Sequence, residues 1–221
     1  MNTDELVARV KEVVKDESFD DAEILSRLND ALLTVAFEFC LPELEATDDL
    51  TFTVGGDTFA PLPDDYHHDL WHIEPQTWSG RVAVMTSLHS LKRLYLDSET
   101  GQTCHAAVDG KTIHVRPMPT EECTVTISYY RIPEALVVSA PSATPAVVAN
   151  SPEGIPSHLH QLLADKVASD IFDIIEDGVD GNKTNTNRYE QRHAQGLLAL
   201  AQYARRSPRL MPYVKRHPRW F

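Results

Sequence analysis

The densest group of side chains that could bind a metal ion lies between residues 64 and 72. It contains three histidines and three aspartates: His67, His68, His72, Asp64, Asp65 and Asp69. Imidazole and carboxylate groups together suit a transition metal, so one interpretation is a metal-dependent hydrolase. However, the group lacks the HExxH spacing of a helical zinc site and has no cysteine pair. Polar surface residues explain it as well, so we predict no metal here and keep the hydrolase as a less favoured alternative.

Two other groups could in principle act in catalysis. Cys104 stands beside His105, but adjacent residues on a strand point to opposite faces and cannot form a nucleophile and base pair. A carboxylate-rich side of a predicted helix could supply a general acid and base, but a solvated helix face is the simpler interpretation. Its residues are Asp170, Asp173, Glu176 and Asp177. The sequence also lacks GxSxG, Walker and GxGxxG motifs, so we predict no catalytic residues and no cofactor.

The charged residues are divided unevenly along the chain. From Arg188 onward there are eight Lys or Arg residues and one Glu, a balance of +7, whereas the whole chain carries −13. Residues 1–187 therefore carry −20. An acidic body repels nucleic-acid phosphates, but the basic C-terminal tail could bind them. A nucleic-acid-binding module that uses this tail is the second alternative.

Cysteine usage and hydropathy indicate the cellular compartment in which the protein is made. Cys40, Cys104 and Cys123 are odd in number and show no CxxC spacing, which favours free thiols. No apolar run approaches the roughly 18 residues that span a bilayer, and the acidic N-terminus is not typical of a signal peptide. We expect a protein made in the cytoplasm, without a membrane partner.

Four segments have the spacing of amphipathic helices. Near the N-terminus they are 3–15 and 20–40, the second beginning with Asp20 as its cap. Near the C-terminus they are 157–177 and 187–205, where Asn187 and Glu190 have the spacing of a capping box. The two C-terminal helices cannot bury their apolar faces on each other alone, so we expect the N-terminal helices to pack against them.

Between the helical segments, residues 50–131 alternate between apolar and polar residues, as strands do. Leu50–Val54 and Thr58–Ala60 surround Gly55-Gly56-Asp57, which predicts a β-hairpin, and two further strands surround Asp109-Gly110. The predicted fold class is therefore α+β: an α-helical bundle with an inserted β-rich subdomain and an extended C-terminal arm. We predict one domain over 1–206 and an arm over 207–221.

The predicted arm contains three prolines and no helical stripe, yet it keeps several aromatic and basic residues. Such residues are enriched among interface anchors, so we interpret the segment as a docking arm; a frayed terminus is the alternative. The predicted contact residues begin at the end of the last helix. They are Arg205, Arg206, Arg209, Tyr213, Lys215, Arg216, Arg219, Trp220 and Phe221.

Several short motifs occur in a specific order along the chain. They are FDDAEILSRLNDA at 19–31, LPEL at 41–44, LPDDY at 62–66, TG at 100–101 and RPMP at 116–119. In this combination the sequence resembles one protein family, the head-to-tail connector (adaptor) proteins of tailed bacteriophages. The resemblance covers most of residues 1–200. The loop 138–150, the connection 178–187 and the chain after Ser207 depart from the family pattern.

The resemblance implies a structural protein of the virion at the interface between head and tail. It implies a ring, of twelve copies in this family, that is coaxial with the portal protein and lies above tail or nozzle proteins. DNA would pass through the ring without sequence-specific binding, and the arm would bind the portal. The acidic body is compatible with a channel for DNA, since like charges keep DNA from sticking to the wall.

Overall fold

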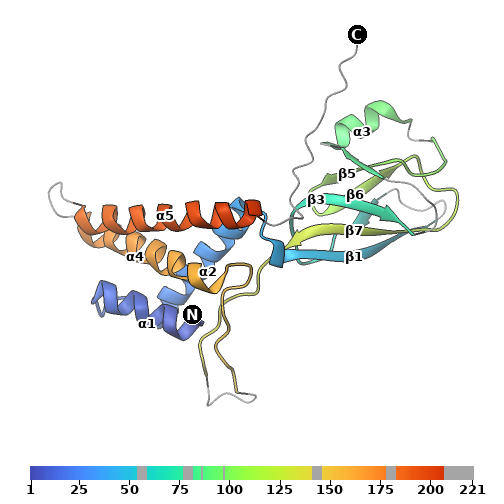
Figure 1. Ribbon diagram of the computed structural model, residues 1–221. Helices are drawn as coiled ribbons and strands as arrows, with labels where there is room; N and C mark the ends of the chain where they lie inside the picture. Colours follow the sequence, from blue (N-terminus) through green and yellow to red (C-terminus); the bar gives the residue numbers. More distant parts are fainter. Residues whose placement is uncertain are drawn as a thin grey trace, which may run out of the picture. The chain divides into compact units, whose positions relative to one another are not determined.

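The computed structural model describes residues 1–53, 59–76, 82–85, 87–96, 98–140, 146–177 and 183–206. The fold is α+β, as predicted (Figure 1). The chain forms two compact units, each of which is described by itself. One comprises Met1–Glu43 and the chain from Pro133 onward, and the other comprises Leu44–Ile132.

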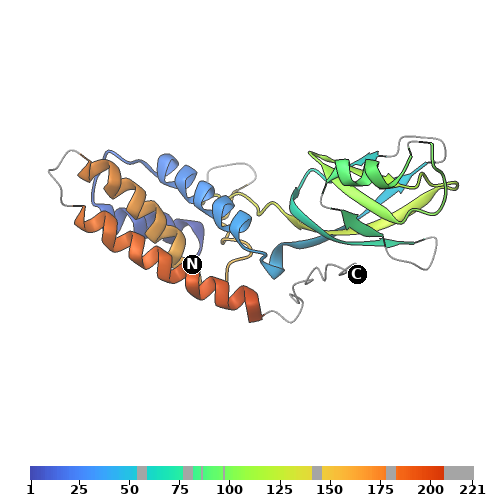
Figure 2. The same ribbon diagram turned by 90° about the horizontal axis from the view of Figure 1, so that it is seen from above.

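The first unit is a helical bundle in which one helix lies at the centre. Its long helices are α1 (Thr3–Val14), α2 (Asp21–Glu38), α4 (Gln161–Glu176) and α5 (Thr184–Arg206). Helix α4 packs against α1, α2 and α5, and it runs alongside α5 in both views (Figures 1 and 2). The N-terminal helices therefore supply the packing partners that the C-terminal pair was predicted to need.

The N-terminal helices begin where their side chains can bind free backbone N–H groups. The side chain of Asn2 accepts a hydrogen bond from the Glu5 amide at 2.9 Å, and the Glu5 carboxylate accepts one from the Asn2 amide at 3.0 Å. These two bonds form a capping box at the start of α1. Asp20 caps α2 by accepting from the Glu23 amide at 2.8 Å, which confirms the predicted start of that helix.

A short 3₁₀ turn, η2 (Ser157–Leu159), precedes α4. The predicted helix 157–177 therefore consists of this turn followed by an α-helix. Helix α4 buries apolar residues on several sides because three helices surround it. The buried residues are Leu162, Leu163, Ala164, Val167, Ala168 and Ile171. Across the α4–α5 contact, the rings of Phe172 and Tyr189 stack with their centroids 5.6 Å apart.

Helices α4 and α5 approach closely at Gly196. A Cβ atom built on Gly196 would lie 2.7 Å from the Cβ of Leu162, a separation that real Cβ atoms do not adopt. Only glycine therefore lets the backbone of α5 lie at this distance from α4.

The second unit contains two sheets that share one core. Strands β1 (Glu45–Phe52), β7 (Cys123–Arg131) and β3 (Tyr66–Pro75) form a three-stranded sheet in that order. Strands β2 (Phe59–Pro61), β6 (Thr112–Arg116), β5 (His105–Asp109) and β4 (Ala83–Met85) form the second sheet, and α3 (Leu88–Leu94) contacts β5 and β4. The core cluster draws on both sheets, with Phe52, Ile73 and Ile127 from one and Ala106, Ile113 and Val115 from the other.

The strands on either side of Asp109-Gly110 pair as predicted, with β5 antiparallel to β6. The β-hairpin predicted over 50–60 is wrong. Strand β1 pairs along its whole length with β7, and β2 pairs with β6 in the other sheet. The alternating pattern identified strands here but could not identify their partners, because those partners are far away in the sequence. The predicted turn, residues 55–57, lies outside the described residues.

The close approach at Gly196 gives a direct test of the helical packing. Replacing glycine by alanine within a helix normally stabilises it by up to about 1 kcal/mol. We expect Gly196→Ala instead to lower the free energy of unfolding by roughly 1–3 kcal/mol, because the added methyl group overlaps with Leu162. Urea denaturation checks this, with Gln195→Ala on the exposed side of α5 as the control. A stabilised Gly196→Ala variant would contradict the close approach of the two helices at this residue.

Candidate functional site

The histidine and aspartate group lies mostly on β3. The rings of His67 and His68 lie 4.8 Å apart, and His72 follows a β-bulge in which Asp69 adopts a positive φ of 51°. Burial and the neighbouring His68 lower the pKa of His67. The described residues contain no group of three or more His, Cys, Asp or Glu side chains that could hold a metal ion. The structure therefore gives no support to the hydrolase alternative.

Asp65, a member of the same group, has a structural partner. It accepts a hydrogen bond from the Tyr129 hydroxyl at 2.7 Å, and its backbone carbonyl accepts one from the Ile132 amide. Burial, together with this bond to Asp65, raises the pKa of Tyr129 well above its ordinary value. Asp65 thus links the start of β3 to Tyr129 of β7 and to Ile132, the residue that follows β7.

Cys104 and His105 contact different groups. The Cys104 thiol donates to the Gln102 carbonyl at 3.2 Å, whereas Nδ1 of His105 lies 2.6 Å from the Tyr95 hydroxyl. A cysteine and histidine that point to separate partners do not activate each other.

The carboxylates at the C-terminal end of α4 hold the start of α5. Asp173 and Asp177 both pair with Lys183, at 2.6 and 3.4 Å. Glu176 accepts hydrogen bonds from the backbone amides of Asn185 and Thr186 at 3.1 and 3.2 Å, and from their side chains at 2.8 and 2.9 Å. The solvated acidic face predicted for this helix is therefore also a cap for the next helix.

This cap explains why the predicted start of the last helix is wrong. Asn187 was expected to cap the helix, but α5 already begins at Thr184, and the Asn187 amide donates within the helix to the Lys183 carbonyl. Glu176 supplies the cap from the preceding helix, so the local spacing of Asn187 and Glu190 was misleading. Although partial desolvation opposes the shift, the bonds from Thr186 and Asn185 lower the pKa of Glu176.

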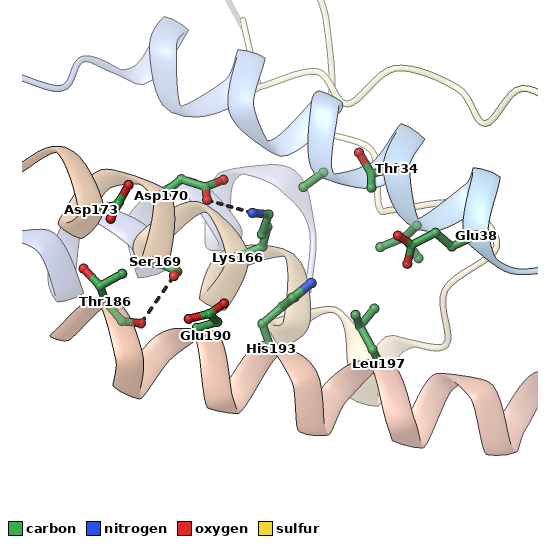
Figure 3. Close-up of a pocket in the computed structure, with 12 residues that line it drawn as sticks. Thr34, Glu38, Lys166, Ser169, Asp170, Asp173, Thr186, Glu190, His193 and Leu197 are labelled. Carbon is green, nitrogen blue, oxygen red and sulfur yellow. Dashed lines mark hydrogen bonds and ion pairs between the residues drawn. The ribbon is translucent and has the colours of Figure 1, made fainter. Parts of the chain in front are cut away.

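A groove of about 480 Å³ opens between α2, α4 and α5 (Figure 3). Its lining combines charged, polar and apolar side chains that are far apart in the sequence. They are Ala31, Thr34, Val35 and Glu38 of α2, Lys166, Ser169, Asp170 and Asp173 of α4, and Thr186, Glu190, His193 and Leu197 of α5. Four carboxylates face one lysine, so the groove suits a basic group better than a phosphate.

Several polar side chains of the groove already have partners within the bundle. Lys166 pairs with Asp170 at 2.7 Å, and the Ser169 hydroxyl donates to the Thr186 carbonyl at 3.3 Å (Figure 3). Nδ1 of His193 lies 2.9 Å from the Leu162 carbonyl, and because a carbonyl only accepts, Nδ1 carries the proton. The imidazole is therefore fixed by α4, and Ser169 is turned toward the backbone of α5. These contacts do not pair Ser169 with His193 as a nucleophile and a base.

Only two of the nine predicted docking residues lie within the described part of the chain. Arg205 and Arg206 lie in the last turn of α5, and the Arg205 side chain is exposed. The other seven, from Arg209 to Phe221, lie outside the described residues. Their contacts remain a prediction.

Comparison with known proteins then decides the family. The family model described as SU10 adaptor protein matches residues 1–215. The chain belongs to the SU10 adaptor protein family. No curated protein matches the chain. This adaptor is therefore a structural protein of a phage particle, and the resemblance to phage head-tail adaptors is confirmed at the level of the family.

No helix among the described residues is long and apolar enough to cross a membrane. Glu176 forms a helix cap, Asp173 forms an ion pair, and His193 contacts a backbone carbonyl. Sequence reasoning missed the groove and the Glu176 cap, because both are built from contacts between helices.

The Glu176 cap predicts a specific dependence of stability on pH. The folded-state pKa of this carboxyl group is below its ordinary value of 4.5. Its contribution to stability is therefore complete above about pH 4.5 and is lost as the pH falls through the folded-state pKa. We expect Glu176→Gln to lower the melting temperature at pH 7, and the difference from wild type to shrink toward about pH 3.

Thermal denaturation followed by circular dichroism between about pH 3 and pH 7 measures this difference. Glu190→Gln is the matched control, since it removes a carboxylate that lines the groove without removing a cap. A difference for Glu176→Gln that stays constant across the pH range would show that the charge of Glu176 does not stabilise α5.

Proposed function

We propose that this adaptor is the head-to-tail connector of a tailed phage. It forms a ring beneath the portal, links the DNA-filled head to the tail, and lets DNA pass. The observation that carries the proposal is the family match over residues 1–215, which makes the protein a phage structural adaptor.

The charge of the chain supports passage of DNA and not its capture. Residues 1–187 carry −20, and a wall of this sign repels a phosphate backbone at short range. A connector must hold its neighbours firmly but must not bind the DNA that moves through it. A low affinity of the acidic body for DNA satisfies the second requirement.

The C-terminal residues are the part that we assign to the portal. Helix α5 presents Arg205 in its last turn, and the sequence continues with Arg209, Lys215, Arg216 and Arg219. Tyr213, Trp220 and Phe221 add the aromatic groups that most often carry binding energy at interfaces. A basic, aromatic arm suits an acidic, grooved surface on the portal.

The basic tail also keeps one other function open. A balance of +7 from Arg188 onward is enough for a nucleic-acid-binding module that acts through the tail alone. Such a module would bind DNA with an affinity that falls steeply with salt, whereas portal binding would also depend on the aromatic residues.

Deleting residues 207–221 tests the assignment to the portal. We expect the shortened chain to keep its melting temperature and its helical circular dichroism, because the packed helices end at Arg206. We expect it to lose attachment to purified portal rings in a sedimentation assay. Trp220→Ala alone is expected to weaken attachment by roughly 30-fold, since truncating an aromatic hot spot costs about 2 kcal/mol or more.

A charge control separates the two functions. Replacing Arg209 and Arg219 by lysine keeps the net charge, so DNA binding through the tail would be retained. If the shortened chain attaches to the portal as well as the full chain does, the arm is not the anchor. If only DNA binding is lost on deletion, the nucleic-acid-binding module replaces the connector proposal.

A further inference from the structure

The outward side of α5 carries a stripe without charge. Between residues 191 and 202 its exposed positions are Gln191, Ala194, Gln195, Leu198, Ala199 and Gln202, which we call the α5 stripe. The spacing of three and four residues places them on one side of the helix, opposite the buried Tyr189, Leu200 and Ala204. Leu198 is 66% exposed. Small and uncharged residues with an exposed leucine form a surface on which another helix can lie closely.

Basic residues outnumber acidic ones on α5, and Arg188 and Arg205 are exposed. Helix α5 contains Arg188, Arg192, Arg205 and Arg206 against Glu190, so its net charge is 4 − 1 = +3. Two stripes of this kind would bring like charges together, which opposes a symmetric contact between the α5 helices of two copies. The stripe therefore needs an acidic partner helix.

Helix α2 of the same bundle has these properties. It contains Asp21, Glu23, Asp30 and Glu38 against Arg27, so its net charge is 1 − 4 = −3. Leu33 is 41% exposed and lies on the side of α2 that is turned away from the groove, with Phe37 one turn further along at 67% exposed. The outward side of α2 thus offers apolar side chains next to Asp30.

The two surfaces lie on different helices of one bundle, and both of these helices pack against α4 (Figures 1 and 2). We propose that the α5 stripe of one copy packs against the outward side of α2 in a second copy of this chain. The proposal rests on the proposed connector function and names its contact between subunits. A contact that joins two different surfaces is head-to-tail, and it closes into a ring when the rotation between copies allows.

Charge and shape both favour this pairing over other partners for the stripe. The +3 of α5 meets the −3 of α2, while the uncharged stripe excludes buried charges from the centre of the contact. An acidic chain repels its own copies in general. Association between copies therefore requires a place where one partner surface is basic, and among the described helices α5 carries the largest positive balance.

Two substitutions test the contact by reversing its charge complementarity. Leu198→Glu places an acid in the α5 stripe, and Leu33→Arg places a base on the acidic α2 surface. Each variant is mixed with portal rings, and adaptor rings are counted by electron microscopy. We expect each variant alone to lose closed rings at least about ten-fold, which corresponds to roughly 1.4 kcal/mol. Leu96→Glu is the control, because Leu96 is 74% exposed and lies in the other unit.

A mixture of the two variants gives the sharper result. Leu198→Glu copies keep an intact α2 surface, and Leu33→Arg copies keep an intact α5 stripe. A head-to-tail contact therefore predicts mixed assemblies that begin as pairs with one copy of each variant. Native mass spectrometry of the mixture, with the two variants distinguished by isotope labelling, measures these pairs. Ala199→Glu replaces Leu198→Glu if circular dichroism shows that the latter is unfolded.

Each outcome decides between the proposals. Lost rings for both variants, retained rings for Leu96→Glu and mixed pairs in the mixture support the contact. Closed rings for either variant, or no mixed pairs, overturn the contact but leave the connector function standing if wild-type rings form on the portal. If wild-type chains form no ring on the portal, the connector proposal fails and the contact between copies fails with it.

Discussion

The close approach of α5 to α4 at Gly196 is the constraint on which the helical unit depends. The missing side chain lets α5 lie against the Cβ of Leu162, and one turn earlier His193 donates to the carbonyl of the same leucine. Both contacts fix the rotation of α5 about its own axis. That rotation decides which residues of α5 face the groove and which are exposed.

The acidic residues of the helical unit also stabilise it through local contacts. Glu176 caps the start of α5, and Lys183 joins Asp173 and Asp177. A second carboxylate, Asp165, is buried and is held by Arg192 of α5 at 3.5 Å and by Gln161 at 3.1 Å. A buried carboxylate is tolerable only with such partners. These carboxylates attach α5 to α4 at several points along the contact. Acidic residues of α4 therefore hold the helix that carries Arg205 and Arg206.

Local signals in the sequence predicted the elements well, and contacts between distant segments account for the errors. Asp20 and the apolar spacing after it predicted α2, and the alternation around Asp109-Gly110 predicted β5 and β6. The expected hairpin failed because β7, more than 70 residues away, is a better partner for β1 than β2 is. The start of α5 was misplaced because its cap comes from Glu176. The groove could not be predicted at all, since three helices from both ends of the chain form it.

The outward helix surfaces of this adaptor are better candidates for its function than the groove is. In the groove, Lys166, Ser169 and His193 each contact another group of the bundle. Leu198 and Leu33, in contrast, are apolar groups that remain in water on two sides of one rigid bundle. Leaving such groups exposed costs free energy that association recovers. The internal polar contacts keep the bundle in one shape. The ring that we propose would require this rigidity, because each small change of angle between identical subunits would be repeated around it.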